Sequence, residues 1–125
     1  MSLTPKTFDT CLNEQSTAVY TATLEDENGT SIGSGAIDAI TLTLSNVADG
    51  AIINSRNVQN VLNLNDVTIT GGGLLTFTLQ PADTTIIDTT QDFETHRATF
   101  QMQFNSVSYH NWDVDFRIRN LTKVP

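Results

Sequence analysis

The strongest constraint on the fold is the alternation of apolar and polar residues near the end of the chain. From Glu94 to Arg119, apolar residues recur at every second position, with a short interruption. A β-strand places successive side chains on opposite faces, so this period predicts two long, half-buried strands. The residues predicted to face the core are His96, Ala98, Phe100, Met102 and Phe104 on the first strand, and Trp112, Val114, Phe116 and Ile118 on the second.

The charges on the outward faces of these two strands select how they pair. In a hairpin that keeps both apolar faces inward, Arg97 can lie opposite either Asp115 or Arg117. Like charges directly opposite each other destabilise a strand pair. We therefore predict that Arg97 faces Asp115, with a loop of about three residues at 105–107.

Shorter alternating segments occur earlier in the chain. Strands are predicted at 16–24, 40–45, 67–70 and 74–79, with turn-forming residues between them. The segment 51–54 returns along 40–45 as a hairpin, and Gly71-Gly72-Gly73 joins two strands. This pattern predicts an all-β fold, an antiparallel β-sandwich of about seven to eight strands.

Two segments suggest short helical turns within this β pattern. Val58, Val61 and Leu62 have helical spacing within 55–64, although asparagines make a long helix unfavourable there. Pro81 stands at the favoured first position of a turn at 81–88. The predicted domain organisation is a polar N-terminal arm at 1–15 followed by the sandwich domain at 16–125.

The composition excludes several classes of partner. Asp and Glu total 14 and Lys and Arg total 6, which gives a net charge of −8. This charge repels the phosphates of nucleic acids and anionic membrane surfaces, so we expect neither partner. The first ten residues lack the apolar region of a secretory signal, and the single cysteine, Cys11, allows no intramolecular disulfide.

The segment D-F-E-T-H at 92–96 is the best candidate for a chemical site. Alternate residues of a strand point the same way, about 7 Å apart, so Asp92, Glu94 and His96 could converge on a metal ion. A metal site usually needs three or four ligands, and no second histidine has suitable local spacing. The favoured interpretation is structural: Asp92 precedes the strand, and His96 closes the edge of the core through a hydrogen bond. Glu94 and His96 remain the minority metal candidates.

No other segment predicts catalysis. The acidic turn at 25–29 lacks the Asp that a calcium-binding EF-hand loop needs at its first position. Cys11 has no recognisable base nearby, and no nucleophile or phosphate-loop motif occurs. We therefore predict a non-enzymatic protein with no catalytic residue and no cofactor.

One outward stripe could serve as a contact surface. Its members lie on the last predicted strand and carry charge of both signs. Such a stripe could contact other subunits, or it could protect an edge strand from aggregation. The members of the stripe are Asp113, Asp115, Arg117 and Arg119.

Five segments of the chain resemble, in the same order, small prophage and bacteriophage proteins. The segments are I-T-L-T-L-S (40–45), G-A-I-I-N-S-R-N-V-Q-N-V-L-N (50–63), T-F-T-L-Q-P-A-D-T-T-I-I-D (76–88), E-T-H-R-A-T-F (94–100) and R-N-L-T-K-V-P (119–125). Those proteins look like the immunoglobulin-like domain of phage tail and baseplate components, such as the N-terminal part of a baseplate upper protein. The resemblance covers about residues 17–125 and carries no catalytic signature.

The resemblance implies an immunoglobulin-like sandwich and a structural or assembly role in a virion. On that reading, other virion proteins are the partners, a homo-oligomer is possible, and the location is the virion or the host bacterial cytoplasm during assembly. Glu94 and His96 would belong to a structural E-x-H strand motif. The alternative is a carbohydrate- or surface-binding β-sandwich module, which predicts exposed aromatic residues in a groove or a calcium ion at 25–30.

Overall fold

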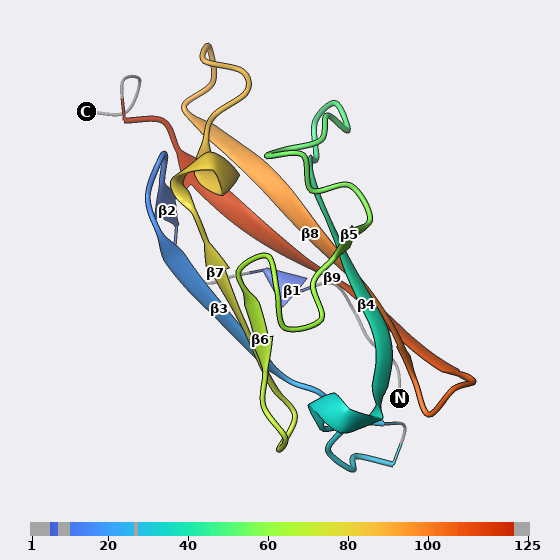
Figure 1. The fold of residues 1–125 in the computed structure, drawn as a ribbon. Coiled ribbons are helices and arrows are strands. Elements are labelled where there is room, and N and C mark those ends of the chain that lie inside the picture. Colours follow the sequence, from blue (N-terminus) through green and yellow to red (C-terminus); the bar gives the residue numbers. More distant parts are fainter. Residues whose placement is uncertain (1–5, 8–10, 27, 122–125) are drawn as a thin grey trace.

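A computed structural model describes residues 6–7, 11–26 and 28–121. Two β-sheets face each other, as Figure 1 shows. The predicted all-β sandwich is therefore confirmed. Two short 3₁₀ turns accompany the sheets, η1 (Ser34–Ala36) and η2 (Pro81–Thr84), and the second confirms the turn predicted after Pro81.

The larger sheet is built on the two long strands. β8 (Phe93–Phe104) pairs on one side with β9 (Ser108–Arg119) and on the other with β4 (Ile37–Asn46). Three strands of two residues each complete this sheet: β5 (Gln59–Asn60) beside β4, and β1 (Lys6–Thr7) and β2 (Leu12–Asn13) beside β9. The smaller sheet has the order β3 (Ala18–Thr23), β7 (Leu74–Leu79), β6 (Val67–Ile69).

The predicted register of the long hairpin is confirmed. Arg97 lies opposite Asp115, and Phe104 opposite Ser108, which leaves residues 105–107 as the loop. The Arg97 guanidinium donates from Nε to Oδ1 of Asp115 at 2.7 Å and from Nη2 to Oδ2 at 3.0 Å. This two-pronged contact matches the planar geometry of both groups, so the alternative pairing with Arg117 would replace an attraction by a repulsion.

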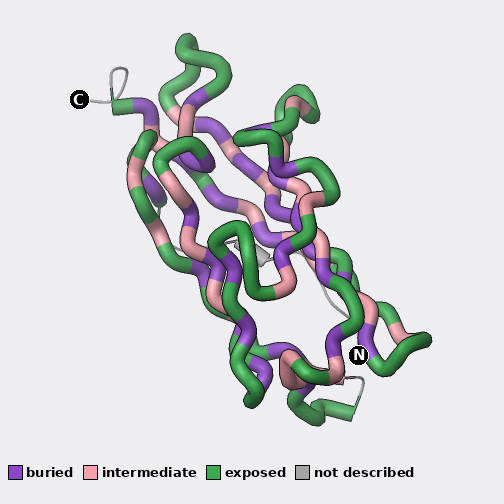
Figure 2. The backbone as a smooth tube through the Cα atoms, viewed as in Figure 1, coloured by how far each residue is buried: buried purple, intermediate pink, exposed green. Residues whose placement is uncertain are grey.

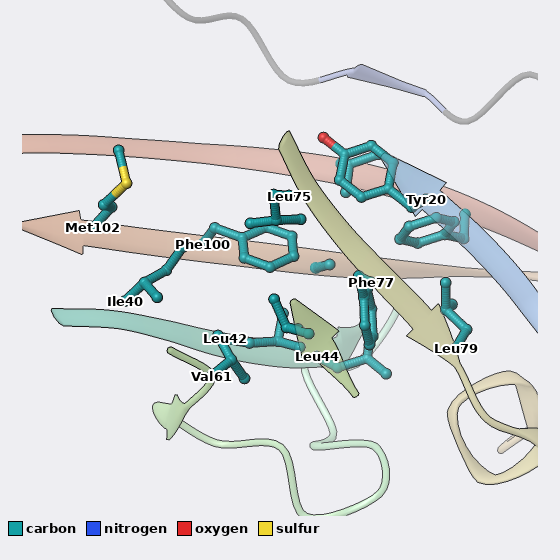
Figure 3. Packing of buried hydrophobic residues seen from close by; sticks show 14 of the residues in the cluster. Tyr20, Ile40, Leu42, Leu44, Val61, Leu75, Phe77, Leu79, Phe100 and Met102 are labelled. Atoms are coloured by element: carbon teal, nitrogen blue, oxygen red, sulfur yellow. The ribbon is translucent and has the colours of Figure 1, made fainter. Parts of the chain in front are cut away.

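The core lies where the inward faces of the two sheets meet, and Figure 2 shows the alternation of buried and exposed positions along the strands. Phe77 of β7 meets Phe100 of β8 edge to face, with ring centroids 6.1 Å apart. Trp112 stacks on Phe100, with ring centroids 4.9 Å apart. In Figure 3, Phe77, Leu75 and Leu79 lie over Phe100, Leu42 and Leu44 across the gap between the sheets. The predicted inward aromatics are therefore core residues, as expected.

The helical turn predicted around Val58 is wrong. Val58 is 59% exposed and has a φ of +49°, and only Val61 is buried in the core. The backbone is extended instead, because β5 runs antiparallel to β4 and Val61 donates its N–H to the carbonyl of Ile40 at 3.0 Å. A sequence spacing that matches a helix was overridden here by pairing with a neighbouring strand.

Two parts of the predicted N-terminal arm form strands. β1 pairs in parallel with β9 at Val114 and Asp115, and β2 does so at Ile118 and Arg119. Leu12 is buried and belongs to the core. At these positions β9 is not an edge strand, so its charges are not needed there to block aggregation.

A buried ion pair fixes the irregular segment 54–66 to the body of the sandwich. Arg56 and Asp83 are 2% and 0% exposed, and Nε and Nη2 of Arg56 donate to the two carboxylate oxygens at 2.6 and 3.0 Å. The remaining guanidinium donors reach Gln59 Oε1, Asn65 O and Asp66 Oδ2 at 2.8–3.0 Å. Every N–H of this arginine therefore has an acceptor, which is what burial of a guanidinium requires.

Replacing Arg56 should be far more damaging than replacing the half-exposed Arg97. Arg56→Met leaves the Asp83 carboxylate buried without its cation, which costs about 3–5 kcal/mol of unfolding free energy. Arg97→Met breaks a pair at the surface, worth about 0–1 kcal/mol. Urea denaturation of both variants measures the difference, and equal losses would contradict the structural role given to Arg56.

Candidate functional site

Glu94 and His96, the minority metal candidates, lie side by side on the inner face of β8. Both are buried, whereas Asp92 is exposed and precedes the strand, which begins at Phe93. The prediction that only Glu94 and His96 share the strand face is therefore confirmed. They lie near the start of β8, the end of the strand that Figure 1 places beside η2 and the 85–92 loop.

Each nitrogen of the His96 ring contacts an oxygen atom of the protein. Nδ1 lies 3.0 Å from the carbonyl oxygen of Asp83, and Nε2 lies 2.6 Å from Oε1 of Glu94. A carbonyl oxygen only accepts hydrogen bonds, so Nδ1 carries a proton. The short contact at Nε2 needs one further proton between the ring and the carboxylate. Both ring nitrogens are therefore committed to hydrogen bonds within the protein.

The Glu94 carboxylate contacts His96 and accepts two backbone N–H groups. Besides His96, the N–H of Ile87 donates to Oε1 and the N–H of Asp88 donates to Oε2, both at 2.9 Å. Backbone N–H groups that converge in this way are a common setting for a buried carboxylate. Glu94 thus fixes the loop before β8 to the strand itself.

This arrangement suits structure better than chemistry. The part of the chain that the structure describes contains no group of three His, Cys, Asp or Glu side chains placed to hold a metal ion. The third member of the sequence triplet, Asp92, contributes its main-chain oxygen to the N–H of Asn120 instead. The hydrogen bond expected from His96 at the core edge is present, and it links β8 to η2.

His96 also connects the Glu94–His96 pair to the buried Arg56–Asp83 pair. Its Nδ1 contacts the main chain of Asp83, whose side chain holds Arg56. We call these four residues, Arg56, Asp83, His96 and Glu94, the polar clamp. Through these four residues, segment 54–66, η2 and the 85–92 loop are all connected to β8. Glu94 and His96, the candidates for a metal site, therefore serve to hold irregular segments against the strand.

A crevice of about 520 Å³ lies beside the polar clamp, between the turn at 46–49 and the loop that leads into β8, and Glu94 is one of its lining residues. Asp49 and Asp88 line it, and each already uses Oδ1 to accept a backbone N–H of its own turn. Hydrogen bonds from the hydroxyl and N–H of Thr90 lower the pKa of Asp88. Phe93 also lines the crevice, and the guanidinium of Arg117 lies 3.8 Å from the centroid of its ring. Arg117 therefore covers one face of the Phe93 ring, so that face cannot stack on a sugar.

The acidic turn expected to hold calcium in the alternative function is organised by its own backbone. Oδ1 of Asp26 accepts the N–H groups of Asn28 and Thr30 at 2.8 and 3.0 Å. This is a side-chain-capped turn, in which the carboxylate satisfies local donors. Glu27 lies outside the described residues.

The charged stripe on β9 is engaged mainly within its own sheet. Asp115 pairs with Arg97, Asp113 accepts the hydroxyl of Thr99 at 2.6 Å, and Arg117 covers Phe93. The main-chain oxygen of Arg119 accepts the N–H of Glu14 at 3.0 Å. These contacts engage the side chains of Asp113, Asp115 and Arg117 within the sheet, and the role of the stripe as a surface for a partner stays a prediction.

The hairpin tip, which we define as residues 105–109, was not predicted from the sequence as an exposed apolar surface. Val107 is 79% exposed and Tyr109 69% exposed, the two most exposed of the large apolar residues in the described part of the chain. The alternation of β9 contained a signal for this exposure: its even-numbered residues face the core, so Tyr109, at an odd-numbered position, should point into solvent. The tip projects from one end of the sandwich in Figure 1.

A carboxylate, a side-chain amide and one backbone–backbone hydrogen bond hold this tip. Oδ2 of Asp38 accepts the N–H of Ser106 at 2.6 Å, and Gln103 Nε2 donates to the carbonyl of Ser106 at 2.8 Å. Asn105 donates its N–H to the carbonyl of Ala36 at 3.0 Å. The tip therefore has a defined conformation although its side chains extend into solvent.

Comparisons with known proteins found no match to any family model, any curated protein or any solved structure. In the described residues, no helix is long and apolar enough to cross a membrane.

Replacing Glu94 by glutamine should lower the free energy of unfolding, because the side chain has a structural role. The amide presents a donor where the carboxylate accepted the N–H of Ile87 or Asp88, so one buried donor loses its acceptor at a cost of about 1–3 kcal/mol. Asp92→Asn, which removes the same charge at an exposed position, is the matched control. Chemical denaturation measures both, and a Glu94→Gln variant as stable as the control would contradict the structural assignment.

Proposed function

We propose that the protein is a non-enzymatic structural or assembly component of a phage or prophage particle, in its tail or baseplate, that acts by docking to other virion proteins. The observation that carries the docking role is the hairpin tip, an ordered projection with exposed Val107 and Tyr109. The location that goes with this role is the virion, or the host bacterial cytoplasm during assembly.

The tip has the properties of a protein-binding anchor. Tyrosine is among the residues that contribute most to binding energy when they are buried at the centre of an interface. Ordering a loop on binding costs free energy, and the contacts of Asp38 and Gln103 with Ser106 have already incurred this cost in the free protein. When such a projection binds a partner, little of the free energy gained by burying its apolar side chains is lost to ordering the loop.

The interior supports docking over catalysis. Its buried ionisable side chains, the members of the polar clamp, hold one another and the surrounding backbone. A catalytic group needs a partner position left open for substrate. In the polar clamp, the side-chain nitrogen and oxygen atoms all have protein partners, including those of Glu94 where it lines the crevice.

The assignment to a phage particle rests on the resemblance of the five sequence segments. The docking role rests on the tip and does not depend on that resemblance. The two parts of the proposal are therefore tested by one experiment with two readouts.

In a host in which the prophage is induced, the wild-type protein should sediment with particles. A Val107→Ser/Tyr109→Ser variant should be strongly depleted from them, because the anchor loses its apolar area while the tip contacts of Asp38 remain. Quantitative immunoblotting of particle and soluble fractions measures this. The matched control is Val47→Ser/Ile52→Ser, which removes exposed apolar side chains elsewhere on the surface.

Two outcomes would count against the proposal, each against a different part. A wild-type protein found only in the soluble fraction would overturn the particle assignment. A tip variant that enters particles as well as the wild type would overturn the tip as the docking surface.

A further inference from the structure

The outer strand of the smaller sheet has an unprotected edge. Within the described residues, β3 has β7 as its neighbour on one side and no strand on the other. The segment 16–24, S-T-A-V-Y-T-A-T-L, contains no charged residue, proline or glycine. Edge strands of monomeric proteins usually carry such residues, because a bare edge is a template for pairing with another strand.

The hydrogen bonds of the sheet show which backbone groups of β3 face outward. Leu24 donates its N–H to the carbonyl of Gly73 at 2.8 Å, and the β3–β7 register continues from this pair without a shift. In an antiparallel pair, alternate residues point their N–H and C=O groups toward the partner. The groups of Val19, Thr21 and Thr23 therefore point away from β7, toward the open edge.

The other edges of the sandwich are shorter or partly covered. β6 has three residues, and β9 is flanked by β1 at Val114 and Asp115 and by β2 at Ile118 and Arg119. The outer side of β4 receives hydrogen bonds from Ile53 and Val61. β3 is thus the longest strand in the described part of the chain that has no strand neighbour anywhere along one side.

We propose that β3 pairs antiparallel with β3 of a second copy of this chain, about a two-fold axis that passes between the two Thr21 residues. The smaller sheets of the two copies then form one continuous sheet across the dimer. A two-fold contact presents the same surface on both copies, so the strand must be complementary to itself.

The residues of β3 meet this condition. On the outward face, Thr21 meets Thr21 of the second copy and Val19 meets Thr23; threonine and β-branched pairs are favourable directly across strands. On the inward face, Ala22 meets Tyr20 and Ala18 meets Leu24, so a small side chain always faces a large one. No charged residue is placed opposite another, although each copy has a net charge of −8.

Cysteine cross-linking tests both the contact and its register. In a Cys11→Ser background, Thr21→Cys places its α-carbon about 5.5 Å from its symmetry mate, as in a hydrogen-bonded antiparallel pair. Disulfides need a separation of about 4.4–6.8 Å, so this variant should form a covalent dimer in mild oxidant. Val19→Cys is the matched control, because its symmetry mate lies four residues further along the strand, about 13 Å away.

A mixture of the Val19→Cys and Thr23→Cys proteins should form the mixed disulfide, since these positions face each other. Val19→Cys alone cross-linking as readily as Thr21→Cys would overturn the register.

Sedimentation velocity over a concentration series tests the dimer without cysteines. The wild type should associate, and Thr21→Lys should abolish association because it places two like charges across the axis. Thr68→Lys, at an exposed position on β6, should associate like the wild type. Circular dichroism checks that both variants fold.

A monomeric wild type throughout the series, or a folded Thr21→Lys variant that still dimerises, would overturn the proposal. The Val107→Ser/Tyr109→Ser variant should still dimerise, which keeps this result separate from that for the hairpin tip.

Discussion

The buried pair of Arg56 and Asp83 is the interaction on which the order of segment 54–66 and of η2 depends. It carries charge into a region with almost no solvent, which is tolerated because every N–H of the guanidinium has an acceptor. The Asp83 carboxylate also accepts the N–H of Gln80, which closes the capping box of η2. One carboxylate thus orients a distant segment and the local turn together.

From this pair the polar clamp continues through His96 to Glu94, and from there to the backbone of Ile87 and Asp88. Long irregular segments have few backbone partners of their own, so they need such contacts to remain ordered. The clamp therefore explains why buried ionisable residues gather at one end of the described part of the protein. The hairpin tip lies at the opposite end of β8, and β3 lies in the other sheet (Figure 1).

The long hairpin was predictable because two independent signals agreed. Side-chain alternation defined the faces, and the charge of Arg97 selected the register. The turn at Val58 was mispredicted because local spacing says nothing about a neighbouring strand or about Arg56, whose partners are 27 residues away at Asp83 and 10 away at Asp66. β1 and β2 have two residues each, too few for any periodic signal. Glu94 and His96 were recognised as a pair, but their partners at 83, 87 and 88 depend on the tertiary fold.

Amide hydrogen exchange tests most directly whether the polar clamp is structural. The N–H groups of Ile87 and Asp88 belong to a loop and would exchange quickly if that loop were held only at its ends. Because both donate to the buried Glu94 carboxylate, they should be protected to the level of the β8 core, whereas Thr89 beside them should exchange quickly. Exchange of Ile87 and Asp88 as fast as that of Thr89 would contradict the structural role of Glu94 and His96.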